Sequence, residues 1–280
     1  MATIFRQIDV FGEGPYTGNP VAVVLGAEGL DDEQLRAFSV WSNLSECTFV
    51  LPPTDPGAEY RVRIFSLSTE LPFAGHLTLG TARAWLDVGG TPRRPETIVQ
   101  QCGAGLLPIR VTGEVLAFAA PPRLRSGPVA PELLQAVVEV LGVDPAAVVD
   151  AEWLDNGPGW VGVLLDSAET VLSLEPDSSH HPGRWDIGVI GPTRPGEEAR
   201  IELRAFFTDG DSPLREDPVT GSLNAAAAQW LLDAGRLCAP YLARQGTALG
   251  RQGRVMVDMD ERGIWVGGRT HVAISGTVAF

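Results

Sequence analysis

Two short segments of the sequence contain acidic residues and, at the expected start of a helix, a glycine followed by a small polar or ionisable residue. The first is Glu70-Leu71-Pro72-Phe73-Ala74-Gly75-His76, and the second is Glu216-Asp217-Pro218-Val219-Thr220-Gly221-Ser222. The first backbone N–H groups of a helix have no intrahelical partner, and a glycine lets a ligand approach them closely. Such helix starts attract anions. Each segment is therefore suited to binding a carboxylate or stabilising developing negative charge, although each alone also fits an ordinary buried helix.

The two segments belong to an internal repeat. A shift of 146 positions superimposes seven residues of the first copy, Glu70, Pro72, Gly75, Ala82, Leu86, Asp87 and Gly89, on identical residues of the second. Both copies have a proline turn, a glycine and an Ala/Leu-rich helix that ends in Leu-Asp-x-Gly. Upstream, Arg63-Ile64-Phe65 corresponds to Arg204-Ala205-Phe206 at a different offset, which leaves room for a short insertion. The repeat predicts two lobes of one design and favours a functional interpretation of both helix starts.

The candidate groups for acid–base chemistry lie in or beside these segments: Glu46, Glu70, His76, Glu216 and Asp217. Glu46 lies in an apolar stretch, 44–53, whose alternation predicts a strand with Glu46, Thr48 and Val50 on one face and Cys47 and Phe49 on the other. A carboxylate in such a strand must be paired, solvated or functional. An edge-strand glutamate that faces water is the alternative.

The reaction class follows from these candidate groups and from the catalytic motifs that the sequence lacks. No Ser or Cys nucleophile lies in an elbow motif, and no phosphate-binding glycine loop is present. Carboxylates and one histidine around anion-binding helix starts suit proton transfer next to a carbonyl or carboxylate.

The elements that must position these residues alternate strands with two central helices. Strands are predicted at 4–11, 20–25, 60–65, 97–101, 106–111, 115–119, 160–165, 170–174, 185–190 and 201–207, with short strands over 253–280; helices are predicted at 31–43, 77–88, 131–141 and 223–234, and a polar loop at 207–215. This order indicates an α+β fold with a mainly antiparallel sheet wrapped around a helix in each lobe. We expect an N-terminal lobe over 1–120 with Glu46 and His76. A C-terminal lobe over 121–280 carries Asp217 and Ser222, and its last strand can cross back to the first lobe.

Composition excludes several function classes. The formal charge of −14, with 21 basic residues among 35 acidic ones, argues against nucleic-acid binding. We expect no membrane span and no signal peptide. The three cysteines are odd in number and far apart, which is typical of reduced thiols in a cytoplasm. No residues have metal-ligand spacing, so we expect no metal.

Four blocks of the sequence, 43–53, 61–65, 70–76 and 216–222, resemble the signature blocks of the PhzF-like phenazine-biosynthesis isomerase family, and 18–23 also matches. The blocks follow the family's order and span most of the chain. The resemblance implies the two-lobed fold of diaminopimelate epimerase, an active site between the lobes, usually a homodimer, and no cofactor. Epimerases of that superfamily use two facing cysteines, whereas none of the three cysteines here lies at either helix start, so two-thiol racemisation is not expected.

The resemblance also implies roles for individual residues. Glu46 would be the base and then the acid that moves a proton between carbons of a dihydro-hydroxyanthranilate ring. His76 and Asp217 would bind and orient substrate groups, and Gly75, Gly221 and Ser222 would contribute hydrogen bonds from the helix starts. The sequence departs from the family at Leu77, where proline is common, and at the 66–69 turn, which puts the substrate's identity in doubt. There are two alternatives. The same chemistry could act on a different secondary-metabolite intermediate, or the protein could be a non-catalytic small-molecule-binding homologue.

Overall fold

The computed structural model describes residues 2–67, 69–208 and 212–280. The chain divides into two compact units: unit 1 comprises Met1–Ala119 and Gly267–Phe280, and unit 2 comprises Ala120–Val266. The first division falls between Ala119 and Ala120, and the end of the chain joins unit 1. Of the segments discussed above, residue 68 of the 66–69 turn and residues 209–211 of the 207–215 loop lie outside the described residues.

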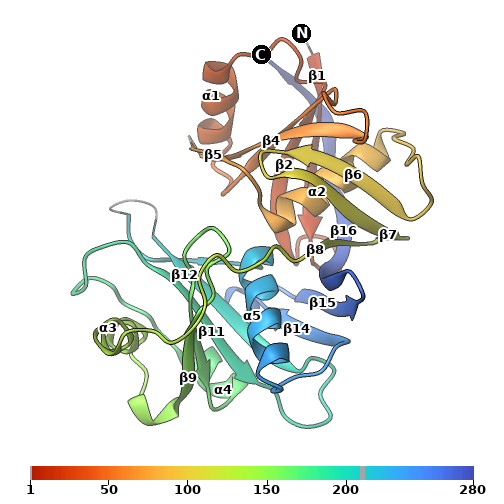
Figure 1. The fold of residues 1–280 in the computed structure, drawn as a ribbon. Helices are drawn as coiled ribbons and strands as arrows, with labels where there is room; N and C mark the ends of the chain where they lie inside the picture. Colours follow the sequence, from red (N-terminus) through yellow and green to blue (C-terminus); the bar gives the residue numbers. More distant parts are fainter. Residues whose placement is uncertain (1, 68, 209–211) are drawn as a thin grey trace. The chain divides into compact units, whose positions relative to one another are not determined.

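Unit 1 encloses one helix in a ring of strands (Figure 1). Its strands follow the order β1-β2-β3-β4-β6-β7-β8-β16, and β16 also pairs with β1, which closes the ring. The elements are β1 (Ala2–Val10), β2 (Asn19–Leu25), α1 (Asp32–Ser42), β3 (Cys47–Leu51), β4 (Tyr60–Ser66), β5 (Thr69–Leu71), α2 (Gly75–Asp87), β6 (Thr97–Cys102), β7 (Gly105–Thr112), β8 (Val115–Ala119) and the end of β16 (Gly263–Ala279).

The first turns of the central helix α2 carry mostly small or apolar side chains on all sides. This part of the helix can therefore be buried all round. Every residue from Gly75 to Ala82 is buried. Gly80 allows the closest approach, because a Cβ atom there would lie 2.2 Å from Cγ1 of Val21 in β2. The outer face of the neighbouring strands carries a separate core that contains Cys47 and Phe49 and packs against α1. The predicted alternation of the strand after Glu46 is therefore confirmed.

Unit 2 has the strand order β16-β15-β14-β12-β11-β10-β9, with β13 paired to β12. Its elements are α3 (Pro131–Leu141), a 3₁₀ turn (Pro145–Ala147), β9 (Val148–Trp153), β10 (Val161–Leu165), α4 (Ala168–Ser173), β11 (Asp186–Pro192), β12 (Ile201–Phe207), β13 (Arg215–Asp217), α5 (Gly221–Asp233), β14 (Tyr241–Gln245), a second 3₁₀ turn (Thr247–Leu249), β15 (Gly253–Asp260) and the start of β16.

Helices cover both faces of the unit 2 sheet. Ile187 and Val189 of β11 point into a core shared with α3 and α4. Between them, Gly188 faces α5, because a Cβ atom there would lie 2.3 Å from Cδ1 of Leu223. Side chains alternate along a strand, so α5 lies on the opposite face from α3 and α4.

The repeat seen in the sequence is a structural repeat. β5 and α2 match β13 and α5 at the shift of 146, while the arginines of β4 and β12 match at a shift of 141. In each copy an arginine of the longer strand forms a two-pronged ion pair with the glutamate of the short strand: Arg63 with Glu70 at 2.8 and 2.6 Å, and Arg204 with Glu216 at 3.1 and 2.8 Å. Each guanidinium also lies over a phenylalanine ring, Phe65 or Phe206. We call these the Arg–Glu clamps of the two units.

One predicted strand is wrong. Residues 170–174 were expected to form a strand, but Ala168–Ser173 is the helix α4. The hydroxyl of Ser167 caps its start by accepting from the backbone N–H of Thr170. At its end Arg204 donates to the carbonyls of Val171 and Leu174. These contacts outweigh the strand preference of β-branched residues.

Candidate active site

Glu46 and His76 meet at the start of α2. Glu46 immediately precedes β3, and His76 is the second residue of α2. Nε2 of His76 lies 3.3 Å from Oε2 of Glu46, with 19% of the glutamate side chain and 6% of the imidazole exposed. The strand and helix are held together where the hydroxyl of Thr81 donates to Oγ1 of Thr48 over 2.9 Å. Because β3 lies between β2 and β4, the alternative that Glu46 sits on an edge strand facing water is wrong.

The neighbours of Glu46 favour its ionised form. Burial by itself raises the pKa of this carboxyl group. The charge of His76 and hydrogen bonds from His76 and Ser45 outweigh burial, so the pKa of Glu46 lies below the ordinary value for glutamate. At neutral pH the side chain is therefore a carboxylate, which is the form that a general base requires.

The start of α2 has no capping side chain. Ala74 occupies the N-cap, Gly75 is the first helical residue, and the first turn contains no acid. Its first N–H groups are therefore directed at whatever lies beyond the helix end, where an anion is favoured. Leu77, which departs from the resembled family, is fully buried. Its side chain is part of the core around α2.

Asp217 ends β13 and is held by a hydrogen-bond network at the start of α5. The hydroxyl of Thr220 donates to Oδ2 of Asp217 over 2.5 Å. Gln245, fully buried in β14, donates through Nε2 to the carbonyl of Asp217 and to Oγ1 of Thr220. Its Oε1 accepts from the backbone N–H of Thr220 and from Nδ2 of Asn224. Sequence reasoning missed Gln245, and only its polarity within an apolar strand could have indicated it.

Gly221 and Ser222 form the first turn of α5, which also lacks a side-chain cap. Oγ of Ser222 accepts from the indole Nε1 of Trp160 over 3.1 Å, and its carbonyl accepts from Nδ2 of Asn156 over 2.9 Å. Sequence analysis placed neither Trp160 nor Asn156 near the site. Both precede β10, far from Ser222 in the chain, so their approach depends on strand pairing.

The structure thus brings the predicted residues together in two groups. Glu46, Gly75 and His76 gather at the start of α2 in unit 1. Asp217, Gly221 and Ser222 gather at the start of α5 in unit 2. The other two acid–base candidates, Glu70 and Glu216, are engaged in the Arg–Glu clamps. Each of these two carboxylates is bound by an arginine of its own unit and is therefore not available for proton transfer.

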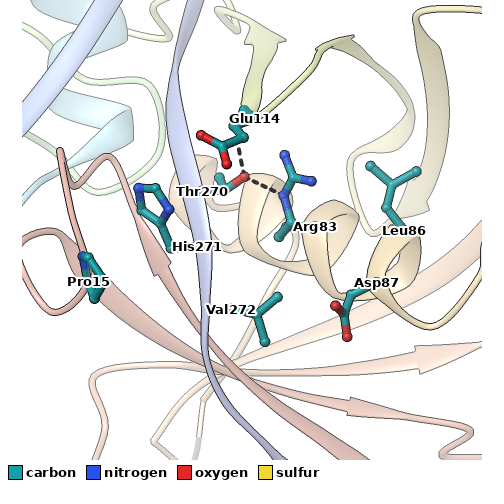
Figure 2. A pocket seen from close by; sticks show the side chains of 8 residues that line it. All are labelled: Pro15, Arg83, Leu86, Asp87, Glu114, Thr270, His271 and Val272. Atoms are coloured by element: carbon teal, nitrogen blue, oxygen red, sulfur yellow. Dashed lines mark hydrogen bonds between the residues drawn. The ribbon is translucent and has the colours of Figure 1, made fainter.

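A separate hollow lies at the opposite end of α2, lined by Pro15, Arg83, Leu86, Asp87, Glu114, Thr270, His271 and Val272 (Figure 2). Nε of Arg83 donates to Oγ1 of Thr270 over 2.8 Å, and the threonine hydroxyl donates to the carbonyl of Glu114 over 3.2 Å. These bonds join the end of α2 to β16. The hollow is on the other end of the helix from His76, so the Glu46 group does not belong to it.

Two further features of the described part of the chain bear on function. Among residues 2–67, 69–208 and 212–280, no group of three or more His, Cys, Asp or Glu side chains is arranged to hold a metal ion. Within the same residues, every helix is too short or too polar to cross a bilayer.

The fold is α+β, with ionisable groups near the start of one buried helix in each unit, and relatives of the chain are named as isomerases. The family model described as phenazine biosynthesis-like protein matches residues 8–280, and the chain belongs to this family. The recognition made from the sequence blocks is confirmed.

Individual relatives agree with this assignment. The chain is 48% identical over 290 aligned positions to an uncharacterized isomerase of Mesorhizobium japonicum, covering 91% of this chain and 90% of the relative. It is 32% identical over 277 positions to trans-2,3-dihydro-3-hydroxyanthranilate isomerase of Pseudomonas fluorescens, covering 96% and 94%. A crystal structure of a PhzF-family phenazine biosynthesis protein of Enterococcus faecalis covers both chains completely, with a TM-score of 0.81 and 22% identity. The last comparison confirms the predicted fold.

Proposed function

We propose that this protein is a cofactor-independent isomerase that moves a proton between carbon atoms of a cyclic, conjugated amino or hydroxy acid. The contact between ionised Glu46 and His76 at the uncapped start of α2 carries the proposal. The Pseudomonas fluorescens relative is named as an isomerase of trans-2,3-dihydro-3-hydroxyanthranilate, which supports this substrate class.

Glu46 performs both halves of the proposed transfer. Its carboxylate first accepts a proton from a substrate carbon, and the electron pair of that C–H bond moves into the conjugated system. The protonated Glu46 then returns a proton to a different carbon as the double bonds shift. No electrons are gained or lost overall, and the carboxylate is regenerated. A positioned group of this kind typically contributes about 10²- to 10⁴-fold in rate.

The other site residues bind the substrate and stabilise charge in this proposal. His76 holds Glu46 in its ionised form and contacts a polar group of the substrate, and Asp217 orients an amino or hydroxyl group. N–H groups at Gly75 and Gly221, with the hydroxyl of Ser222, donate to carboxylate or developing enolate oxygens. Donors fixed before the reaction begins stabilise such charge strongly.

The replacement Glu46→Gln tests the proposal, because it keeps the size and polarity of the side chain but removes the base. We expect kcat to fall by about 10²- to 10⁴-fold, while the Kd for a substrate analogue changes only a few-fold. The matched replacement Asp217→Asn should raise KM more than it lowers kcat. A Glu46→Gln variant that keeps kcat within ten-fold of the wild type would contradict the proposal.

We further propose that the protein acts in the cytoplasm, as its three scattered cysteines indicate, and that it is a homodimer, as the family resemblance implies. Sedimentation velocity of the purified protein tests the assembly, with a single species of twice the 29.8 kDa chain mass expected. A monomer at micromolar concentration would contradict it.

A further inference from the structure

Strand register identifies a counterpart of Glu46 in unit 2. The clamp phenylalanines mark equivalent positions in β4 and β12. Phe65 pairs with Cys47 of β3, and Phe206 pairs with Ile187 of β11. The residues immediately before Cys47 and Ile187 are Glu46 and Asp186. Each unit therefore places an acid at the same position of the same strand.

Asp186 also lies on the same face as Glu46. In unit 1, Cys47 and Phe49 point into the outer core, and Thr48 contacts Thr81 of α2. In unit 2, Ile187 and Val189 point toward α3 and α4, and Gly188 faces α5. Alternation places Asp186 on the α5 face, two residues from Gly188. Only 12% of its side chain is exposed.

Strand pairing relates Asp186 to residues that contact the start of α5. Val161 pairs with Ile187, so one step back along both strands Trp160 adjoins Asp186. Trp160 is bonded to Ser222, and Asn156 is bonded to the Ser222 carbonyl. Oδ1 of Asn156 is buried and has no hydrogen-bond partner among the residues that the structure describes. This region therefore contains a carboxylate and an amide oxygen that still lacks a donor.

Among the described residues, Asp186 forms an ion pair with an exposed arginine. Nε of Arg184 lies 2.9 Å from Oδ2 of Asp186, but 70% of the arginine side chain is exposed. Burial raises the pKa of Asp186 to about 6, with Arg184 opposing the shift and Asp155 adding to it. An exposed arginine contributes little to such a pair, so Arg184 can be displaced by a better buried cation.

We propose that Asp186, together with Oδ1 of Asn156, binds a protonated primary amino group of the substrate. A primary ammonium has three donors and no acceptor, which matches a region that contains a carboxylate and an amide oxygen without a donor. The inference rests on the proposed function and narrows its substrate class to acids that carry a primary amino group.

A pair of saturated ring acids provides the test. Calorimetric titration compares 2-aminocyclohexanecarboxylate, whose amine is protonated at pH 7.5, with cyclohexanecarboxylate, which lacks the amine. We expect the wild type to bind the amino acid at least about ten-fold more tightly, or about 1.4 kcal/mol. Asp186→Asn should reduce this preference to less than about three-fold and leave the affinity for cyclohexanecarboxylate within two-fold. Circular dichroism establishes that the variant is folded.

The matched variant Arg184→Gln separates ligand binding from a structural ion pair. It should keep the preference for the amino acid, because Arg184 competes with the ligand for Asp186. The inference is overturned by a wild type without preference, by Asp186→Asn with an unchanged preference, or by Arg184→Gln with the same loss as Asp186→Asn. The Glu46→Gln variant should keep the preference. If Glu46→Gln also keeps wild-type turnover while the amine preference depends on Asp186, the proton-transfer proposal fails and the amine site stands.

Discussion

Glu46 and Asp186 occupy the same strand position beside α2 and α5, yet their surroundings change their pKa values in opposite directions. The pKa of Glu46 is lowered, because the charge and hydrogen bonds of its neighbours outweigh burial. The pKa of Asp186 is raised to about 6, because burial outweighs an exposed arginine. The charge of His76 opposes burial at Glu46, whereas at Asp186 the exposed Arg184 opposes it more weakly. A duplicated framework can thus provide one acid suited to proton transfer and another suited to binding a cation.

The Arg–Glu clamps differ in a similar way. In unit 1, 24% of the Arg63 side chain and 41% of the Glu70 side chain are exposed. In unit 2 the corresponding values for Arg204 and Glu216 are 8% and 9%. Arg204 additionally bonds to two carbonyls at the end of α4. The same pair of residues is therefore a surface ion pair in one unit and a buried structural connection in the other.

Replacing the two clamp arginines tests this difference and should give the largest effect on stability. Arg204→Met leaves the buried carboxylate of Glu216 and two carbonyls without their partner, and should lower the free energy of unfolding by about 3–5 kcal/mol. Arg63→Met should cost about 0–1 kcal/mol. Urea unfolding followed by fluorescence measures both. Equal losses would contradict the assigned difference in burial.

Replacing Asp186 should stabilise the protein near neutral pH. Its folded pKa of about 6 lies above the reference value of 3.8. The folded protein therefore binds the proton more tightly, and stability falls as pH rises from about 4 to 6. Above about pH 6, the ionised Asp186 lowers the free energy of unfolding by up to about 3 kcal/mol. Asp186→Asn should raise Tm at pH 7 and show little gain at pH 4.

Glu46→Gln provides the control for that stability measurement. Because the pKa of Glu46 is lowered in the folded protein, its ionisation contributes stability above its ordinary pKa, and this contribution is lost as pH falls through the folded pKa. The replacement should therefore lower Tm at pH 7. A gain in Tm for both variants would show that the two acids do not differ as described.

Removing the imidazole should change the pH dependence of turnover. In His76→Gln, no positive charge at position 76 counteracts the effect of burial on Glu46. The pKa of Glu46 should therefore rise. The acid limb of kcat/KM should then move to higher pH, since a base works only above its pKa. An acid limb at the wild-type position would show that His76 does not control the ionisation of Glu46.

The smallest expected effect concerns the network that holds Asp217. Thr220→Val removes the hydroxyl that donates to Oδ2 of Asp217 and should cost about 1 kcal/mol in ligand binding. Titration with 2-aminocyclohexanecarboxylate measures the loss. Thr78→Val, a replacement in α2 that removes a buried hydroxyl bonded to Gln100, is the matched control and should leave ligand affinity unchanged.

The sequence predicted the two central helices and the strands around them because their periodicity is local. It placed the helix starts two residues late, at 77 and 223, since Gly75 and Gly221 gave no apolar signal. The three-residue strands β5 and β13 are too short to show alternation. The helix α4 was missed because its end depends on Arg204, which is distant in the chain.

Glu46 and His76 were assigned to one site through a family resemblance, because spacing alone does not bring together residues on separate elements. Asp186 was not recognised as the counterpart of Glu46 in the second copy of the repeat. The clear shift of 146 applies from Glu70 onward, whereas insertions alter the offset upstream. Strand register is therefore needed to relate the two acids, and sequence reasoning cannot supply it.

Solvent-deuterium labelling is the most direct test of Glu46 as the proton carrier. The wild type and Glu46→Gln are incubated in D₂O with trans-2,3-dihydro-3-hydroxyanthranilate, and NMR follows deuterium at the ring carbons. The account predicts label at a ring carbon of the wild-type product and none above the uncatalysed background for Glu46→Gln. Labelling by Glu46→Gln at the wild-type rate would show that another group carries the proton.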